Sequence, residues 1–191
     1  MDKIILGTIA EIAAGIREKK VSPIEVVETH LERVEEVQPK LNTFVHLDAE
    51  GARRRARVAE AAVMKGNALG PLHGVPLTIK SCMDVAGWPT PSGSLLRKDY
   101  VAQSDAPLVA RLRAAGAIIL GNTNTPEYLM AYETDNSLSG KTSNPWNLER
   151  SAGGSSGERR QRLRRAARWA EWGAMGAGRF VCPRIFAGFV G

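Results

Sequence analysis

The sequence has little of several features that define protein classes. Only two cysteines occur among its 191 residues, Cys82 and Cys182, far apart and without metal-ligand spacing. Neither a disulfide scaffold nor a zinc site is therefore indicated. No apolar run reaches the roughly 18 residues of a transmembrane helix. We therefore expect no membrane partner. The apolar beginning of the chain is interrupted by Glu11 and lacks a basic segment, so we expect no signal peptide. The two separate cysteines suit a reducing compartment, so we expect a cytoplasmic location.

Histidine is scarce as well, which limits the catalytic groups that the chain can carry. The three histidines are His30, His46 and His73, and none lies near a serine in a G-x-S-x-G turn. A Ser-His-Asp triad is therefore unsupported. His73 lies in a turn flanked by glycines, and we interpret it as a structural residue.

Acidic residues are scarce only at the end of the chain. The formal net charge is +6, yet residues 1–157 contain 18 Lys and Arg and 18 Asp and Glu. Residues 158–191 contain eight Arg and two Glu, and they account for the whole excess. Arginines near tryptophans can bind nucleic acid, so a nucleic-acid-binding protein is one alternative. Because an out-of-frame reading of GC-rich DNA also yields many arginines, we do not expect a nucleic-acid partner.

Helix and strand signals alternate through most of the chain. Ser22, Pro23 and Glu25 form a strong helix start, because serine caps, proline fits the first turn and glutamate completes a capping box. The other predicted elements are helices over residues 50–65 and 105–115 and strands over residues 75–80 and 117–120. This order predicts an α/β layered fold. Residues 134–157 are predicted to form a long polar loop.

The predicted helix over residues 50–65 contains four arginines, which we interpret as a solvated face: Arg53, Arg54, Arg55 and Arg57. Two other features contain residue types that can take part in catalysis. Lys80 ends an apolar strand, and residues 152–157 form a run of glycine and serine. Taken singly, each has a common explanation, since a lysine at a strand end usually extends to solvent and a Gly-Ser run is usually a linker.

Together with their neighbours, these features resemble the amidase-signature family. Gly74–Lys80, followed by Asp84–Gly87, is similar to the segment around the catalytic lysine of that family. Residues 116–124 and 144–148 then match in order and spacing, and the Gly-Ser run 153–157 comes last. Residues 1–157 are thus identified as the N-terminal part of an amidase domain.

The resemblance implies a Ser–cis-Ser–Lys triad. Lys80 would be the general base, and Ser155 the bridging serine after a cis peptide bond from Gly154. A lysine has a pKa of about 10.4 in water, so burial must lower it before the amine can act as a base near neutrality. The residues of the loop that would turn tightly and present backbone N–H groups to an oxyanion are Gly153, Gly154, Ser156 and Gly157.

The fold that the resemblance implies is α/β, a mixed sheet covered by helices, and incomplete in this chain. The implied reaction is hydrolysis of the C–N bond of a small-molecule carboxamide to a carboxylate and ammonia or an amine. Neither a metal nor an organic cofactor is implied. Whether the complete protein forms a homodimer is an open question.

The family pattern stops after Gly157. The family continues with an alanine-rich helix and a D-G-G-G-S-I-R segment, whose serine is the nucleophile and is expected here near Arg179. No serine follows Ser156 in this chain. The nucleophile is therefore missing, and we expect the chain as written to be inactive.

A shift of reading frame explains this break. Regrouping the codons of the stretch by one position fixes three glycine codons, each where the family has glycine: Trp169–Ala170, Trp172–Gly173 and Met175–Gly176. We predict that residues 158–185 are out of frame and that residues 186–191 return to frame. A coding sequence without any alternative-frame signal would contradict this prediction.

Two further alternatives stay open. One is the A subunit of the tRNA-dependent amidotransferase, although residues 125–128 and 131–136 look more like those of stand-alone amidases. The other, from a different class, is a non-catalytic remnant, because family members are much longer than this chain. An incomplete sheet would expose strand edges and apolar faces, which predicts poor solubility.

Overall fold

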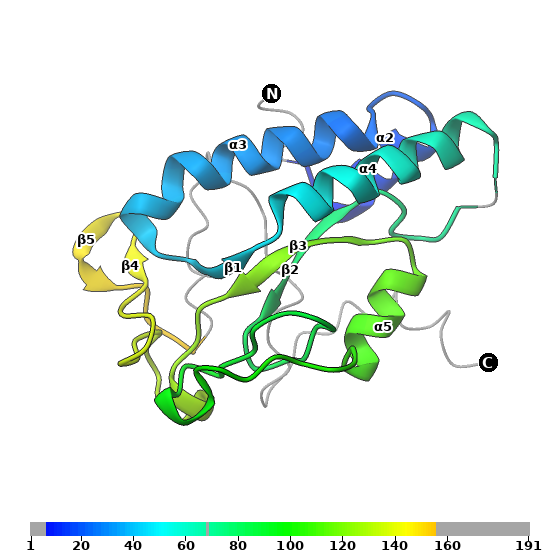
Figure 1. Ribbon diagram of the computed structural model, residues 1–191. Helices are drawn as coiled ribbons and strands as arrows, with labels where there is room; N and C mark the ends of the chain where they lie inside the picture. The colour runs from blue at the N-terminus through cyan, green and yellow to red at the C-terminus, as the bar shows by residue number, and fades with distance from the viewer. Residues whose placement is uncertain (1–6, 68, 156–191) are drawn as a thin grey trace.

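The computed structural model describes residues 7–67 and 69–155. Figure 1 shows helices packed around a small central sheet, and the bounds of the elements follow the chain. The helices are α2 (Ile9–Arg17), α3 (Pro23–Leu41), α4 (Ala49–Met64) and α5 (Pro107–Ala114), with short 3-10 turns η1 (Leu95–Arg97) and η2 (Glu127–Leu129). The strands are β1 (Phe44–Leu47), β2 (Pro76–Lys80), β3 (Ile118–Thr123), β4 (Ser143–Asn144) and β5 (Asn147–Ser151).

The helices begin where local capping chemistry places them. The Ser22 hydroxyl accepts hydrogen bonds from the backbone N–H groups of Ile24 and Glu25, and Pro23 opens α3, as predicted. The Asp48 side chain caps α4 by accepting from the Gly51 N–H, and the helix begins at Ala49, one residue before the predicted start. α5 begins at Pro107 and is followed by Gly116, whose φ of +91° suits a residue without a side chain.

The central sheet is mixed, with the strand order β1-β3-β2. β2 and β3 run parallel, whereas β1 pairs with β3 in the antiparallel direction. Alternate residues of β3 serve two apolar cores on the two faces. Ile118 and Leu120 pack against α3 and α4, and Ile119 joins the second core, which includes side chains of α2 and α5. Figure 1 shows α3 and α4 side by side over one face and α5 on the other side. The predicted α/β fold with a mixed sheet is confirmed.

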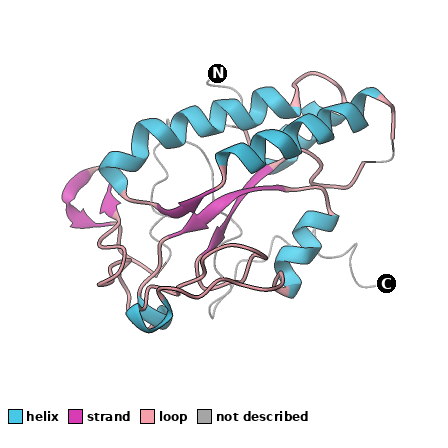
Figure 2. Ribbon diagram, in the orientation of Figure 1, coloured by secondary structure: helices cyan, strands magenta, loops and turns pink. Residues whose placement is uncertain are grey.

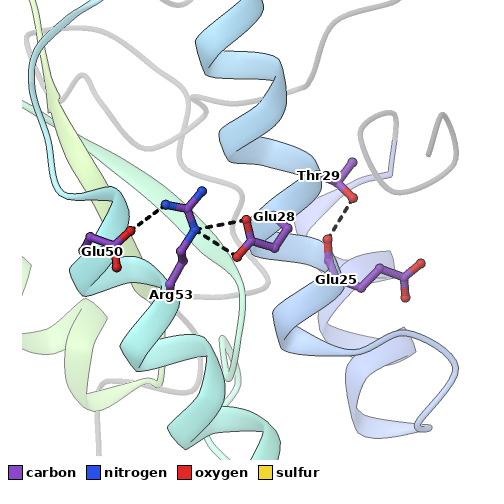
Figure 3. A network of polar contacts seen from close by, with 5 residues as sticks. All are labelled: Glu25, Glu28, Thr29, Glu50 and Arg53. Carbon is purple, nitrogen blue, oxygen red and sulfur yellow. Dashed lines mark hydrogen bonds and ion pairs between the residues drawn. The ribbon is translucent and has the colours of Figure 1, made fainter.

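The arginine-rich face of α4 is not simply solvated, which corrects the interpretation from sequence. Figure 3 shows Arg53 between two carboxylates, with Nε 3.0 Å from Glu28 of α3 and Nη1 2.8 Å from Glu50. Arg55 pairs with Asp48 at 3.0 Å and donates to the backbone carbonyl of Ile119 at 2.8 Å. Half of these arginines therefore join α4 to α3 and to the sheet.

Three short elements were not expected from the sequence: α2, β1 and the β4–β5 hairpin. β1 has only four residues, all of intermediate burial, so it lacks the alternating pattern that marks a strand. The hairpin lies inside the stretch predicted as a long loop. Its strands are short, with two residues in β4 and five in β5. Within residues 7–67 and 69–155, no helix is long and apolar enough to cross a membrane.

Candidate active site

Lys80 is the last residue of β2 and is buried. All five residues of this strand are buried, and the lysine itself is 3% exposed. Its register partner on the neighbouring parallel strand is Thr123, so both residues lie at the ends of β2 and β3 where loops gather (Figure 2). The common alternative, a lysine extended into solvent from a strand end, does not apply here.

Ser155 comes from a segment 75 residues further along the chain, yet it meets this lysine. The Lys80 amine donates to the Ser155 hydroxyl at 3.3 Å between Nζ and Oγ. This distance lies at the long end for a hydrogen bond to a hydroxyl, and catalytic contacts in unliganded sites are commonly long. The structure thus brings together the two residues that the sequence indicated for catalysis.

The glycines before Ser155 give the chain its turn. Gly153 has a φ of +64° and Gly154 a φ of +85°, a region that residues with side chains rarely adopt. The Gly154 N–H donates to the Tyr132 carbonyl, and the Gly154 carbonyl accepts from the Thr134 hydroxyl at 2.9 Å. The N–H of Gly154 is therefore engaged inside the protein and does not face an oxyanion in this structure.

The cis peptide bond that the resemblance implied before Ser155 is not found, since every peptide bond of residues 7–67 and 69–155 is trans. A cis bond between residues other than proline costs about 3–4 kcal/mol and requires surroundings that impose it. Several other predictions lie outside the described residues: Ser156, Gly157, the position of Arg179 and the segments 158–185 and 186–191.

The three histidines each make a contact inside the protein. His30 is buried, its Nδ1 lies 2.6 Å from the Val26 carbonyl, and burial lowers its pKa from 6.5 to about 4. His46 packs against Trp88 with ring centroids 4.9 Å apart, and partial burial lowers its pKa. His73 Nε2 lies 3.0 Å from the Ala59 carbonyl, which agrees with the structural role predicted for it. In the described part of the chain, no three His, Cys, Asp or Glu residues cluster in a way that would hold a metal ion.

The sequence did not predict a group of buried polar side chains on or beside the two strands next to Lys80. Within the described residues, three such side-chain atoms have no hydrogen-bond partner: Ser81 Oγ, Asn122 Oδ1 and Thr123 Oγ1. Buried polar atoms are usually paired, so unpaired ones mark places where a ligand or water can bind. These residues lie within or next to β2 and β3. The feature of the sequence that could have indicated them is the polar residues at the ends of apolar strands.

These features define a class of protein. A layered α/β domain places a buried lysine against the hydroxyl of a serine that follows two left-handed glycines. Residues 25–157 match the protein family described as Amidase. The chain belongs to this family, the amidase-signature enzymes.

Characterised relatives agree with this assignment. The chain is 43% identical over 157 residues to the A subunit of glutamyl-tRNA(Gln) amidotransferase from Acidothermus cellulolyticus, covering 82% of this chain and 31% of the relative. It is 47% identical over 147 residues to indoleacetamide hydrolase from Bradyrhizobium diazoefficiens, covering 77% and 28%. It is 41% identical over 181 residues to acylamidase from Rhodococcus erythropolis, covering 95% and 38%.

Solved structures with a similar fold also belong to this family. A bacterial aryl acylamidase of the amidase-signature family superposes with a TM-score of 0.75 at 35% identity, covering 81% of this chain and 32% of that one. The chain thus spans about a third of the length of the relatives that it matches.

Proposed function

We propose that this chain carries the lysine–serine part of an amidase site, which hydrolyses a carboxamide to a carboxylate and ammonia or an amine. The observation that carries the proposal is the contact of the buried Lys80 amine with the Ser155 hydroxyl at 3.3 Å. Family membership supports it, because the relatives named indoleacetamide hydrolase and acylamidase are amide-cleaving enzymes by name.

The proposed chemistry is a proton relay. Lys80, in its neutral form, accepts the proton of the Ser155 hydroxyl, and Ser155 in turn accepts the proton of a nucleophilic serine. The serine oxygen attacks the amide carbon, the C–N bond breaks, and the relayed proton leaves with the nitrogen. Water then attacks the acyl carbon and gives a proton to Lys80 through Ser155, and the relay returns a proton to the nucleophilic serine oxygen as the acyl C–O bond breaks.

The nucleophile of this relay is expected near Arg179, where the chain has no serine. We propose that the reading frame shifts near Gly157–Glu158 and returns near Ile185–Phe186. One finding supports this: the family match ends at residue 157, where the reading frame is proposed to shift. Sequencing the gene across codons 150–190 tests the proposal, and DNA that encodes the arginine-rich segment with no serine in the neighbouring frame would contradict it.

Ammonia release tests the proposed function itself. The chain encoded by the resequenced gene is incubated with a panel of simple carboxamides, beside a Ser155→Ala variant. Ser104, which is exposed and remote in sequence, supplies the control variant Ser104→Ala. We expect release by the parent and the control but not by Ser155→Ala. Equal release by all three would show that Ser155 has no part in the reaction.

A second candidate function is the A subunit of a tRNA-dependent amidotransferase, favoured by the 43% identity to such a subunit. The two candidates differ in what they need. A stand-alone amidase releases ammonia from simple amides without another protein, whereas the named relative is one subunit of an amidotransferase. Release of ammonia by the purified chain alone supports the first candidate. Release that requires partner subunits supports the second.

A further inference from the structure

The backbone before Ser155 is held at two points by one neighbouring loop. The Thr134 hydroxyl donates to the Gly154 carbonyl at 2.9 Å, and the Gly154 N–H donates to the Tyr132 carbonyl. The backbone N–H and the backbone carbonyl of Gly154 are therefore both hydrogen-bonded to the segment 132–134. Thr134 itself is completely buried.

Among residues 7–67 and 69–155, no packing contact holds Gly154 in place. Apart from its chain neighbours, no heavy atom of these residues would lie within 4 Å of a methyl group added at its Cα, and its φ is +85°. A glycine in open space has the widest choice of backbone conformations. The two hydrogen bonds, rather than steric contacts, therefore fix the conformation of Gly154 and with it the direction of the following residue, Ser155.

Thr134 is tied in turn to the strand that flanks Lys80. Its carbonyl accepts from the Thr142 N–H at 2.9 Å, and the Asn124 side chain donates to the Thr142 hydroxyl at 3.1 Å. Asn124 directly follows Thr123, the register partner of Lys80. Hydrogen bonds between buried residues, together with the backbone between them, thus link Gly154, next to Ser155, to Thr123, the register partner of Lys80.

Two further side-chain amides, of Asn136 and Asn42, add hydrogen bonds within and to the loop that follows Thr134. Asn136 donates to the Asn124 carbonyl oxygen at 2.8 Å and to the Thr125 backbone carbonyl at 2.7 Å. Asn42, at the end of α3, donates to the Ser139 carbonyl at 2.6 Å. Figure 1 shows the β4–β5 hairpin beside that end of α3. Networks in which buried polar groups are mutually satisfied rigidify the parts that they join.

We propose that Thr134 is a positioning residue, which sets the Ser155 hydroxyl against the Lys80 amine through its hydrogen bond to Gly154. This inference rests on the proposed function, in which Lys80 and Ser155 exchange a proton. Thr134 does not touch the lysine in this role; it acts on Ser155 through the backbone.

The test measures the titration of Lys80 in the full chain. The chain is labelled with ¹³C-lysine, and the Cε resonance of Lys80 is assigned from its absence in Lys80→Met. Its pH midpoint is then compared in four variants: Thr134→Ser, Thr134→Val, Ser155→Ala and the Thr134→Val/Ser155→Ala double variant. Thr134→Ser keeps the hydroxyl, whereas Thr134→Val keeps the shape and removes it.

We expect Thr134→Ser to keep the parental midpoint and Thr134→Val to move it to the midpoint of Ser155→Ala. The double variant should match Ser155→Ala, because Thr134 acts only through Ser155. A parental midpoint in Thr134→Val, or a further shift in the double variant, would overturn the inference while leaving the proposed function standing. An unchanged midpoint in Ser155→Ala would overturn both.

Folding is checked by thermal melting of each variant. If Thr134→Val does not fold, Thr134→Ala takes its place in the same comparison. Failure of both to fold overturns the inference, because Thr134 would then maintain the fold and not the position of one serine.

Discussion

At the scale of single residues, burial decides which protonation states the folded chain tolerates. His30 is a clear case, because its imidazole is buried and its Nδ1–H donates to the Val26 carbonyl at 2.6 Å. Burial disfavours the charged imidazolium, which is why the pKa of His30 falls from 6.5 to about 4.

This pKa predicts how stability depends on pH. Between pH 6.5 and about 4, the unfolded chain protonates His30 and the folded chain does not, so the free energy of unfolding decreases as the pH falls. The loss amounts to about 3 kcal/mol over this window and stops below the folded pKa. Urea unfolding at several pH values measures it.

A His30→Gln variant supplies the comparison, because glutamine does not titrate. We expect its stability profile to be flatter between pH 6.5 and 4 but not level, since burial also lowers the pKa of His46. A profile as steep as that of the parent would show that His30 is not the group responsible.

At the scale of elements, the sheet depends on a close approach of two strands. Gly121 of β3 lies opposite Leu47 of β1, and a methyl group at this glycine would lie 2.2 Å from the His46 carbonyl oxygen. That oxygen belongs to the backbone, so it cannot move aside without separating the strands. Only glycine permits β1 and β3 to pair in this register.

We therefore predict that Gly121→Ala destabilises the chain by about 1–3 kcal/mol. Gly15 of α2 is the matched control, because a methyl group there would meet a side-chain atom of Val21 at 3.1 Å and no backbone atom of another element at 2.2 Å. Chemical denaturation compares Gly121→Ala with Gly15→Ala. Equal stability of the two variants would mean that the strands adapt to the added methyl group.

Most of the larger elements were predictable because their signals are local. Ser22 with Pro23 marked the start of α3, and the apolar run before Lys80 marked β2. β1 and the β4–β5 hairpin were not predictable, since short half-exposed strands acquire their structure from partners far along the chain. Residues 134–155, which were predicted to be part of a long loop, contain the β4–β5 hairpin and are joined by hydrogen bonds to one another and to Asn124, which directly follows β3.

The candidate site was predictable only in part. Lys80 and Ser155 were found through the resemblance of several motifs in order, because neither residue is distinctive alone. The role of Thr134 was not predictable, since it depends on a contact across 20 residues between two loops. The engagement of the Gly154 N–H also required the three-dimensional arrangement.

At the scale of the whole molecule, several large apolar side chains of the described residues remain exposed. Leu96, Met130 and Tyr132 are 88%, 88% and 93% exposed, and β1 and β2 form the edges of the described sheet. Exposed apolar groups and open strand edges promote association. We predict that the chain expressed alone self-associates, which sedimentation or light scattering detects. A monodisperse sample that melts cooperatively would contradict this prediction.

Ammonia release by Lys80→Met tests the central claim most directly. Methionine keeps the length of the buried side chain and removes its amine, and Lys98→Met removes an exposed amine as the control. In the chain encoded by the resequenced gene, we predict that Lys80→Met lowers kcat/KM roughly 10²–10⁴-fold, as expected for loss of a general base, and that Lys98→Met leaves it unchanged. Undiminished release by a folded Lys80→Met variant would show that the contact between Lys80 and Ser155 is not the working part of an amidase site.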